Sequence, residues 1–128
     1  MSLTLPQRIE KLEIRLARVE GAADRPMWPS IRRIIDQVAA HYSVSKVHLL
    51  GSARAAHIAL ARHMAMHLCR ELHGHSLMRI GSAFNRDHTS VLHAVRRIAA
   101  LLETDPALRA TWDALAEAIM AHHPEKEA

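Results

Sequence analysis

Apolar residues recur three or four positions apart in several segments of the chain, a spacing that gathers them on one face of an α-helix. One such face is formed by Ile31, Ile34, Ile35 and Val38. Aliphatic residues dominate the composition, aromatic residues make up 3% of the chain, and runs of β-branched residues are absent. With only 4 glycines and 5 prolines, this composition favours an all-α fold, a compact helical bundle with an aliphatic core.

Capping residues and helix breakers divide this pattern into six segments. Ser45, Ser76 and Asp87 each stand where a short polar side chain can cap the helix that follows. Asp105 precedes Pro106, and proline suits the first turn of a helix. The expected helices cover residues 29–42, 46–50, 57–72, 77–83, 88–103 and 106–120.

The N-terminal segment carries its own periodicity. Five apolar residues there are spaced alternately by four and three positions, which is the a/d seam of an amphipathic, coiled-coil helix. They are Leu5, Ile9, Leu12, Leu16 and Val19. In a parallel pair Arg8 would face Glu13 and Arg15 would face Glu20, so both pairs have opposite charge. The segment therefore predicts a homodimer. Packing of this helix on its own domain is the alternative, because two heptads are marginal alone.

Turn residues and charge divide the chain into three parts. A stretch with two prolines and Gly21 ends the first part, and the sign of the charge changes near residue 101. The parts are an N-terminal helix at 1–25, a central domain at 26–104 and an acidic helix and tail at 105–128. Residues 26–100 hold ten Arg or Lys against three acids, a net charge of +7, whereas residues 101–128 hold two against six, a net of −4. A basic centre favours a polyanionic partner, and a solvated basic surface is the alternative.

The remaining composition limits the compartment and the chemistry. Cys69 is the lone cysteine, which permits no disulfide within the chain and fits a reducing compartment. The opening residues MSLTLPQRIEKLE carry charges where a signal peptide needs an apolar stretch, and the apolar runs are too short to span a bilayer. We expect a soluble cytoplasmic protein, associated with the nucleoid if its partner is DNA. No nucleophile–base pair or glycine-rich phosphate loop stands out, so we expect neither an enzyme nor a cofactor.

Histidines are numerous, with 11 in the chain, and His63 and His67 stand one helical turn apart. Such a pair can ligate zinc. However, Cys69 lies about 200° round the helix from His67, and no glutamate follows His63 as a metalloprotease requires. We therefore expect no metal site.

Residues 76–100 have the layout of a helix-turn-helix, with a short helix, a tight turn at Asn85 and Arg86, and a longer helix. In such a unit the N-terminal residues of the second helix meet base edges in the DNA major groove. Here that first turn reads Asp-His-Thr-Ser, ahead of an apolar face. Short hydroxyl side chains can donate to bases, and unpaired N–H groups at a helix start attract phosphate. A capped surface helix is the alternative that this spacing leaves open.

One string in this region is highly specific. The sequence RDHTSVLHA resembles the signature Arg-Asp-His-Thr-Thr-Val-Leu-His-Ala of the C-terminal DNA-binding domain of the bacterial replication initiator DnaA. The segments IRRIIDQVAAHYSVSKVHLL, ARHMAMHLCREL and HSLMRIGSAF also match, so that the resemblance covers residues 31–98. It implies a domain that reads a short, asymmetric duplex site. No Gly-x-x-x-x-Gly-Lys-Ser/Thr motif occurs, so we expect a stand-alone reader without the ATPase domain.

The resemblance also implies particular contacts with DNA. In the family the recognition helix reads bases in the major groove, and a loop before the long helix sends an arginine into the minor groove. The long helix and the start of the short helix contact phosphates. The matching positions are Arg86, Asp87, His88, Thr89, Ser90 and His93 on the recognition helix, Arg54 in the loop, Arg62, His63 and Arg70 on the long helix, and Ser76 and Leu77 on the short helix.

The chain departs from the family pattern at three places. Asn85 stands where the family has two glycines, so the turn is one residue shorter, a change that can tilt the recognition helix. Ser90 replaces a second threonine and lacks its methyl group, and the loop reads SARAAH where the family is rich in Arg and Lys. Fewer phosphate contacts predict weaker binding and a shallower salt dependence.

These patterns together predict a sequence-specific double-stranded DNA-binding protein, acting as a transcriptional regulator or as a modulator of replication initiation. The alternative is a protein-interaction module. In that case the basic face or the acidic last helix would bind a replication or transcription protein without reading DNA sequence.

Overall fold

The computed structural model describes residues 28–121, and the predicted coiled-coil seam lies outside this range. The described residues form six helices and no strand. The helices are α2 (Ile31–Tyr42), α3 (Lys46–Leu50), α4 (Ala56–Leu72), α5 (Leu77–Phe84), α6 (His88–Thr104) and α7 (Pro106–Met120). The all-α prediction is confirmed, and every helix expected in this range is present with its ends displaced by at most two residues.

Side chains that the sequence places before the helices fix where most of them begin. Ser45 accepts a hydrogen bond from the His48 amide at 3.1 Å, and Ser76 accepts one from the Arg79 amide at 3.1 Å. The Asp105 carboxylate accepts from the Leu108 amide at 3.0 Å, with Pro106 in the first turn of α7. Each bond satisfies one of the amides that a helix start leaves without a partner, so the helix boundaries are set locally.

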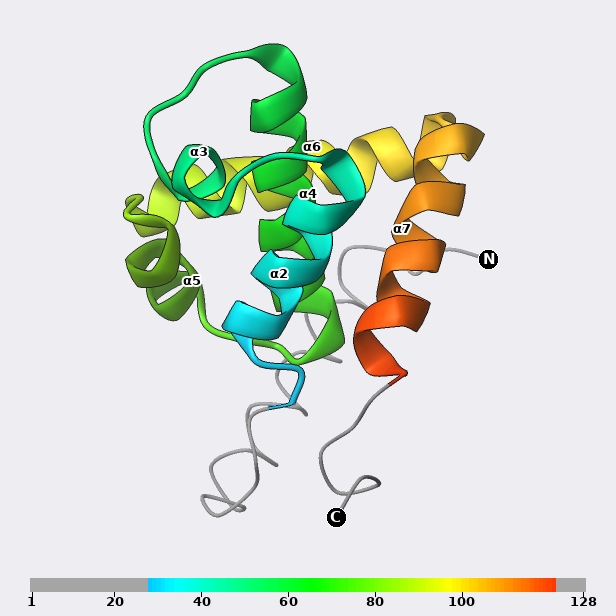
Figure 1. Ribbon diagram of the computed structural model, residues 1–128, viewed down its shortest axis with the longest axis horizontal. Helices are drawn as coiled ribbons and strands as arrows, with labels where there is room; N and C mark the ends of the chain where they lie inside the picture. Colours follow the sequence, from blue (N-terminus) through cyan, green and yellow to red (C-terminus); the bar gives the residue numbers. More distant parts are fainter. Residues whose placement is uncertain (1–27, 122–128) are drawn as a thin grey trace.

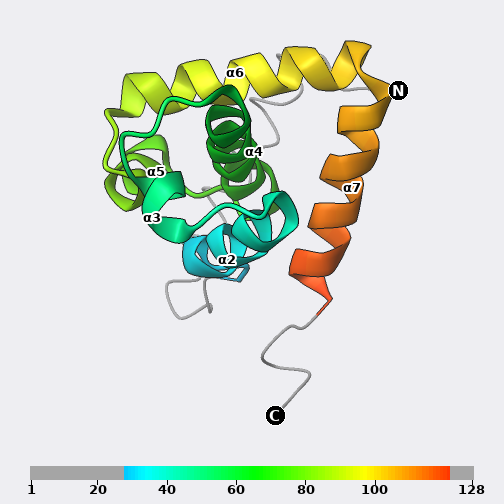
Figure 2. The ribbon, with the colours of Figure 1, turned by 45° about the horizontal axis from the view of Figure 1, so that its top comes forward.

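Helix α4 lies at the centre of the molecule and packs against all the other described helices. Figure 1 shows α6 passing behind α4, with α5 beside the start of α6, and Figures 1 and 2 show α2 along the flank of α4. Among the buried apolar side chains of the described residues Phe84 is the one aromatic, and the others are aliphatic or sulfur-containing, as the composition predicts. Those fully buried include Ile34, Val38, Leu49, Met64, Leu68, Ile80, Val91, Ile98 and Ile119.

The acidic helix α7 belongs to this same core. Its inner face buries Leu108, Leu115 and Ile119, and it lies alongside α2 in Figure 2. Trp112 donates from Nε1 to Nδ1 of the buried His67 at 2.9 Å, which joins α7 to α4. Arg33 of α2 donates to the carbonyl oxygens near the end of α7, at 3.0 Å to Ala118. The change in charge near residue 101 therefore does not coincide with a break in packing.

No helix among residues 28–121 is long and apolar enough to cross a membrane.

Candidate nucleic-acid interface

Helices α5 and α6 meet at a left-handed turn. Asn85 ends α5 with φ of 54°, a conformation that asparagine tolerates better than most residues other than glycine. The next amide, that of Arg86, donates back to the Gly81 carbonyl at 2.8 Å. The single asparagine thus closes the turn where the family pattern has two glycines, and α6 begins at His88.

Gly81 allows the turn to pass close to α5. A Cβ atom at this position would lie 2.5 Å from the Arg86 carbonyl oxygen and 3.5 Å from the His88 amide nitrogen. The first distance is far below van der Waals contact, so the helix start can sit here only because residue 81 has no side chain. Sequence reasoning missed this residue, although a glycine inside a helical pattern was the available signal.

The first turn of α6 is exposed on one side and buried on the other. Asp87, His88, Thr89, Ser90 and His93 are exposed. Underneath them the same helix buries Val91, Ala94 and Ile98. The packing therefore directs a row of polar side chains outwards while the apolar face anchors the helix, the arrangement that the sequence predicts for this stretch.

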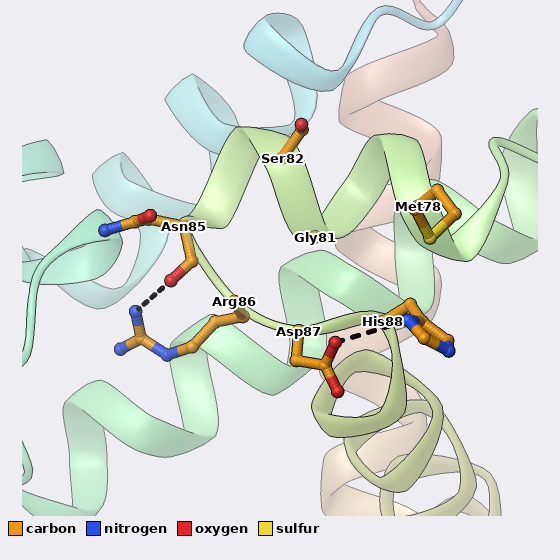
Figure 3. A pocket seen from close by; sticks show the side chains of 7 residues that line it. All are labelled: Met78, Gly81, Ser82, Asn85, Arg86, Asp87 and His88. Atoms are coloured by element: carbon orange, nitrogen blue, oxygen red, sulfur yellow. Dashed lines mark hydrogen bonds and ion pairs between the residues drawn. The ribbon is translucent and has the colours of Figure 1, made fainter.

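An open groove of about 390 Å³ runs between this first turn and α5. Figure 3 shows its lining side chains projecting from both helices and from the turn. They are Met78, Ser82, Asn85, Arg86, Asp87 and His88, with Gly81 at the floor. Met78 was not singled out from the sequence, yet 67% of it is exposed. An exposed methionine in a polar groove offers an apolar contact surface beside the hydrogen-bonding groups.

Asp87 occupies the N-cap position of α6, but its side chain makes no capping hydrogen bond. The capping role predicted for it is therefore only partly correct. The carboxylate is instead 3.2 Å from Nδ1 of His88 (Figure 3). A hydrogen bond with the Thr89 side chain is the largest effect that lowers the pKa of Asp87, and the charge of His88 and the nearby backbone amides of Thr89 and His88 add to it, although neither amide is in the geometry of a capping bond. The carboxylate is thus tied to the two side chains that follow it in the helix.

The arginine at position 62 faces protein backbone. Arg62 is 6% exposed and donates to four carbonyl oxygens, two in α3 and two in the segment that joins α3 to α4. The acceptors are Leu49 at 2.7 Å, His48 at 2.9 Å, Ala53 at 3.0 Å and Gly51 at 3.2 Å. Burial, and then the charge of Arg86, lower its pKa. The resemblance implies a phosphate contact for Arg62, and these bonds give its guanidinium a different set of partners.

The remaining long-helix positions differ from one another. His63 is half-buried, and its Nδ1 lies 3.0 Å from Nη1 of the exposed Arg97 on α6. Burial first, and then the charges of Arg97, Arg62 and Arg86, lower the pKa of His63. Burial and the neighbouring arginine charges thus favour the uncharged imidazole, and a ring that accepts from Arg97 at Nδ1 is the tautomer with its proton on Nε2. Arg70, two turns further along α4, donates to the His75 carbonyl at 2.8 Å.

Three positions, one in a loop and two at a helix start, complete the set. Arg54 is exposed in the segment before α4, whose N-cap residue, Ala55, provides no side-chain capping bond. Ser76 caps α5 and is exposed, and Leu77 beside it is partly buried against the core. No group of three or more His, Cys, Asp or Glu side chains within residues 28–121 is placed to hold a metal ion.

A short helix, a left-handed turn and a longer helix with an exposed polar first turn define a helix-turn-helix domain. The chain belongs to the family of the bacterial DnaA protein helix-turn-helix, whose model matches residues 31–98. The resemblance drawn from RDHTSVLHA is thereby confirmed. Membership implies DNA binding, the general activity of this class of domain.

Known proteins agree with this assignment. The chain is 42% identical over 94 residues to the chromosomal replication initiator protein DnaA of Deinococcus radiodurans, covering 73% of this chain and 20% of that protein. It is 44% identical over 72 residues to the same-named protein of Tropheryma whipplei, covering 56% of this chain and 15% of that one. A crystal structure of a DNA replication initiation factor superposes with a TM-score of 0.67 at 26% identity, covering 91% of this chain and 36% of that one. The chain thus spans a fifth or less of the two curated relatives.

Proposed function

We propose that this protein binds double-stranded DNA sequence-specifically, with α6 lying in the major groove. The observation that carries the proposal is the exposed first turn of α6 on a helix whose other face is buried. Such a helix holds its hydrogen-bonding side chains in fixed positions on a rigid core. Recognition of bases in the major groove requires this.

Within this proposal the contacts divide into base reading and phosphate binding. His88, Thr89, Ser90 and His93 read bases in the major groove, and Asp87 orients the first two through its contacts with them. Arg54 reads the neighbouring minor groove from its exposed loop.

The phosphate contacts flank these reading groups. Ser76 and Leu77 lie at the start of α5, an end of a helix that favours phosphate, and the paired His63 and Arg97 join α4 to α6. Arg70 and Arg86 add to the positive potential of this region without being counted among the phosphate contacts, because each guanidinium already donates to backbone carbonyls. The net charge of +7 over residues 26–100 supports a polyanionic partner.

The biological role proposed here is that of a transcriptional regulator or a modulator of replication initiation. The relatives named as chromosomal replication initiator proteins support a target related to an initiator site. The shorter turn at Asn85 and the sparsely charged SARAAH loop favour a site that differs from theirs.

Selection of duplexes from a random library, followed by titration of Thr89→Ala and His88→Ala, tests the proposal. Loss of one base contact is expected to lower affinity for the selected site by about 5- to 150-fold, equivalent to about 1–3 kcal/mol. Preference at one base pair should be lost as well.

Thr104→Ala is the matched control, because Thr104 is exposed at the far end of the same helix and bonds only within it, to Leu101. It should leave affinity unchanged. Site preference that survives both first-turn substitutions would contradict the proposal. Weak, salt-insensitive binding without any preference would favour the protein-interaction alternative.

A further inference from the structure

We propose that Arg86 is a positioning residue that sets the loop carrying Arg54 relative to the recognition helix, with Arg62 holding the same loop from α4. The inference rests on the proposed function, in which Arg54 and α6 read adjacent grooves. It assigns to Arg86 a role inside the protein, where the family resemblance implies a contact with DNA.

The Gly51 carbonyl oxygen is the point where the two arginines meet. Nη2 of Arg86 donates to it from the helix-turn-helix turn, and Nη2 of Arg62 donates to it from α4 at 3.2 Å. Gly51 directly follows α3 and lies 35 residues before Arg86 in the chain. A single acceptor thus connects the loop to the turn and to the central helix.

Arg86 also bonds to the turn between α5 and α6, in which it lies. Its Nη1 donates to the carbonyl oxygens of Phe84 at 3.1 Å and Asn85 at 3.3 Å, the latter drawn in Figure 3. The left-handed conformation of Asn85 turns the chain sharply where these carbonyls lie. The guanidinium therefore bridges the turn and the loop, with one nitrogen on each.

Arg62 binds carbonyls on both sides of Gly51. It binds those of His48 and Leu49 in α3, and that of Ala53 one residue before Arg54. Carbonyls at a helix C-terminus lack amide partners and attract positive charge, so the two arginines satisfy groups that the short α3 leaves open. The loop backbone is held while the Arg54 side chain remains exposed.

Only arginine can make this connection. Its planar group presents donors in a fixed fork that reaches two chain segments at once, whereas the lysine ammonium is a single compact donor on a flexible stem. Arg86→Lys therefore keeps the positive charge and removes the bridge. The spacing between the major-groove and minor-groove contacts then loses its constraint.

A double-mutant cycle with Arg54→Ala and Arg86→Lys tests the inference on a selected duplex. The base pairs read by Arg54 are defined as those where Arg54→Ala loses discrimination. Arg86→Lys should lower discrimination at those pairs at least threefold and leave discrimination at the pairs read by Thr89 intact. Adding Arg86→Lys to Arg54→Ala should cause no further loss of discrimination at those pairs. Without the Arg54 side chain, the position of the loop no longer affects them.

The salt dependence separates positioning from direct contact. Loss of one phosphate contact changes the slope of log affinity against log salt concentration by about 0.9. In Arg86→Lys and Arg86→Ala the slope should change by less than about half of that amount. A slope lowered by about 0.9 in Arg86→Ala, with losses additive to those of Arg54→Ala, would show a phosphate contact and overturn the inference. Arg96→Lys, at an exposed arginine of α6, is the matched control and should retain discrimination at both sets of pairs.

A measurement on the free protein guards against a folding defect. Backbone order parameters over residues 51–55, measured by NMR relaxation, should fall in Arg86→Lys and in Arg62→Lys, because the two arginines hold the carbonyls of this loop, while those of the α4 core stay high. Unchanged order parameters in the loop of both variants would also overturn the inference. If the wild-type protein shows no duplex preference, the proposed function fails. If Thr89→Ala behaves as expected but Arg86→Lys does not, only the positioning role fails.

Discussion

Single residues set the geometry of the candidate interface through close backbone contacts. Gly81 is the clearest case, because the atom that a side chain would meet belongs to the backbone and cannot rotate away. Asn85 shows the complementary effect, in which a left-handed residue ends one helix and lets the next begin three residues later. Neither residue touches DNA in the proposal, yet both decide where the reading side chains stand.

Gly81→Ala is predicted to destabilise the fold and to displace the start of α6. Alanine favours a helix over glycine by up to about 1 kcal/mol, but its Cβ would lie 2.5 Å from the Arg86 carbonyl oxygen. Overpacking of this kind costs about 1–3 kcal/mol. Urea unfolding would measure the loss, with Ser82→Ala, the exposed neighbour in the same helix, as the control. A Gly81→Ala protein as stable as the wild type would contradict the steric argument.

A second prediction at the residue scale concerns the stability of the fold at acidic pH. His75 is 3% exposed, its Nε2 lies 2.9 Å from the Pro29 carbonyl, and burial is the main cause that lowers its pKa to about 4. The unfolded chain takes up a proton near the ordinary value of 6.5, whereas the folded chain does not. Stability from this group is therefore complete above pH 6.5 and declines as the pH falls towards 4.

Chemical denaturation at several pH values would check this. His75→Gln should be less stable at pH 7 and should lose less stability between pH 6.5 and 4 than the wild type does. Leu72→Ala, which removes a partly buried apolar side chain nearby in sequence, should lower stability equally at each pH. Equal pH slopes for wild type and His75→Gln would contradict the assignment. His63, whose pKa is also lowered, adds to the wild-type slope in the same direction.

At the scale of helices, the structure shows that the acidic helix α7 packs as part of the same core as the basic centre. Its charge separates it from the basic centre, but its inner face completes the core against α2, α4 and α6. The bond from Trp112 to His67 and the donation from Arg33 fix its register. The acidic residues of this helix lie on its solvent-exposed face, because its apolar face packs against the core.

A pair of neighbouring residues in α7 tests this packing. Ile119 is fully buried, whereas Met120 is 43% exposed. Ile119→Ala should lower the free energy of unfolding by about 2–5 kcal/mol, because it leaves a cavity as well as losing apolar burial. Met120→Ala should stay within about 0.5 kcal/mol of the wild type. Similar losses for both, in a denaturant titration, would indicate that α7 does not share the core.

At the scale of the whole molecule, the arrangement of reading groups favours an asymmetric site. In the proposed mode of binding, the helix-turn-helix and the loop arginine would present different chemistry to adjacent grooves, so a single copy would read a duplex in one direction. A paired molecule would then require two such sites at a fixed spacing.

Pairing remains a prediction from the seam at residues 5–20. Deletion of residues 1–22 should halve the mass found by light scattering and leave helix content over residues 28–121 intact. A monomeric mass before and after deletion would contradict the dimer. Replacement of Ile9 and Leu16 with aspartate is the finer variant, because it disrupts the a positions while keeping the chain length.

The sequence by itself determined the elements of this protein. Helix boundaries depend on local rules, such as the caps at Ser45, Ser76 and Asp105, so periodicity and capping were enough to place them. The string RDHTSVLHA was enough to indicate the family and the exposed first turn.

Only the tertiary structure decided how these elements are held together. That Arg62 binds four carbonyls, 9 to 14 residues away, and that Arg86 shares Gly51 with it, 35 residues away, depends on chain segments that only the fold brings together. Sequence spacing carries no information about such contacts, because the positions of the partners follow from the packing of the whole bundle. An arginine on a helix looks the same in sequence whether it faces a phosphate or a neighbouring loop.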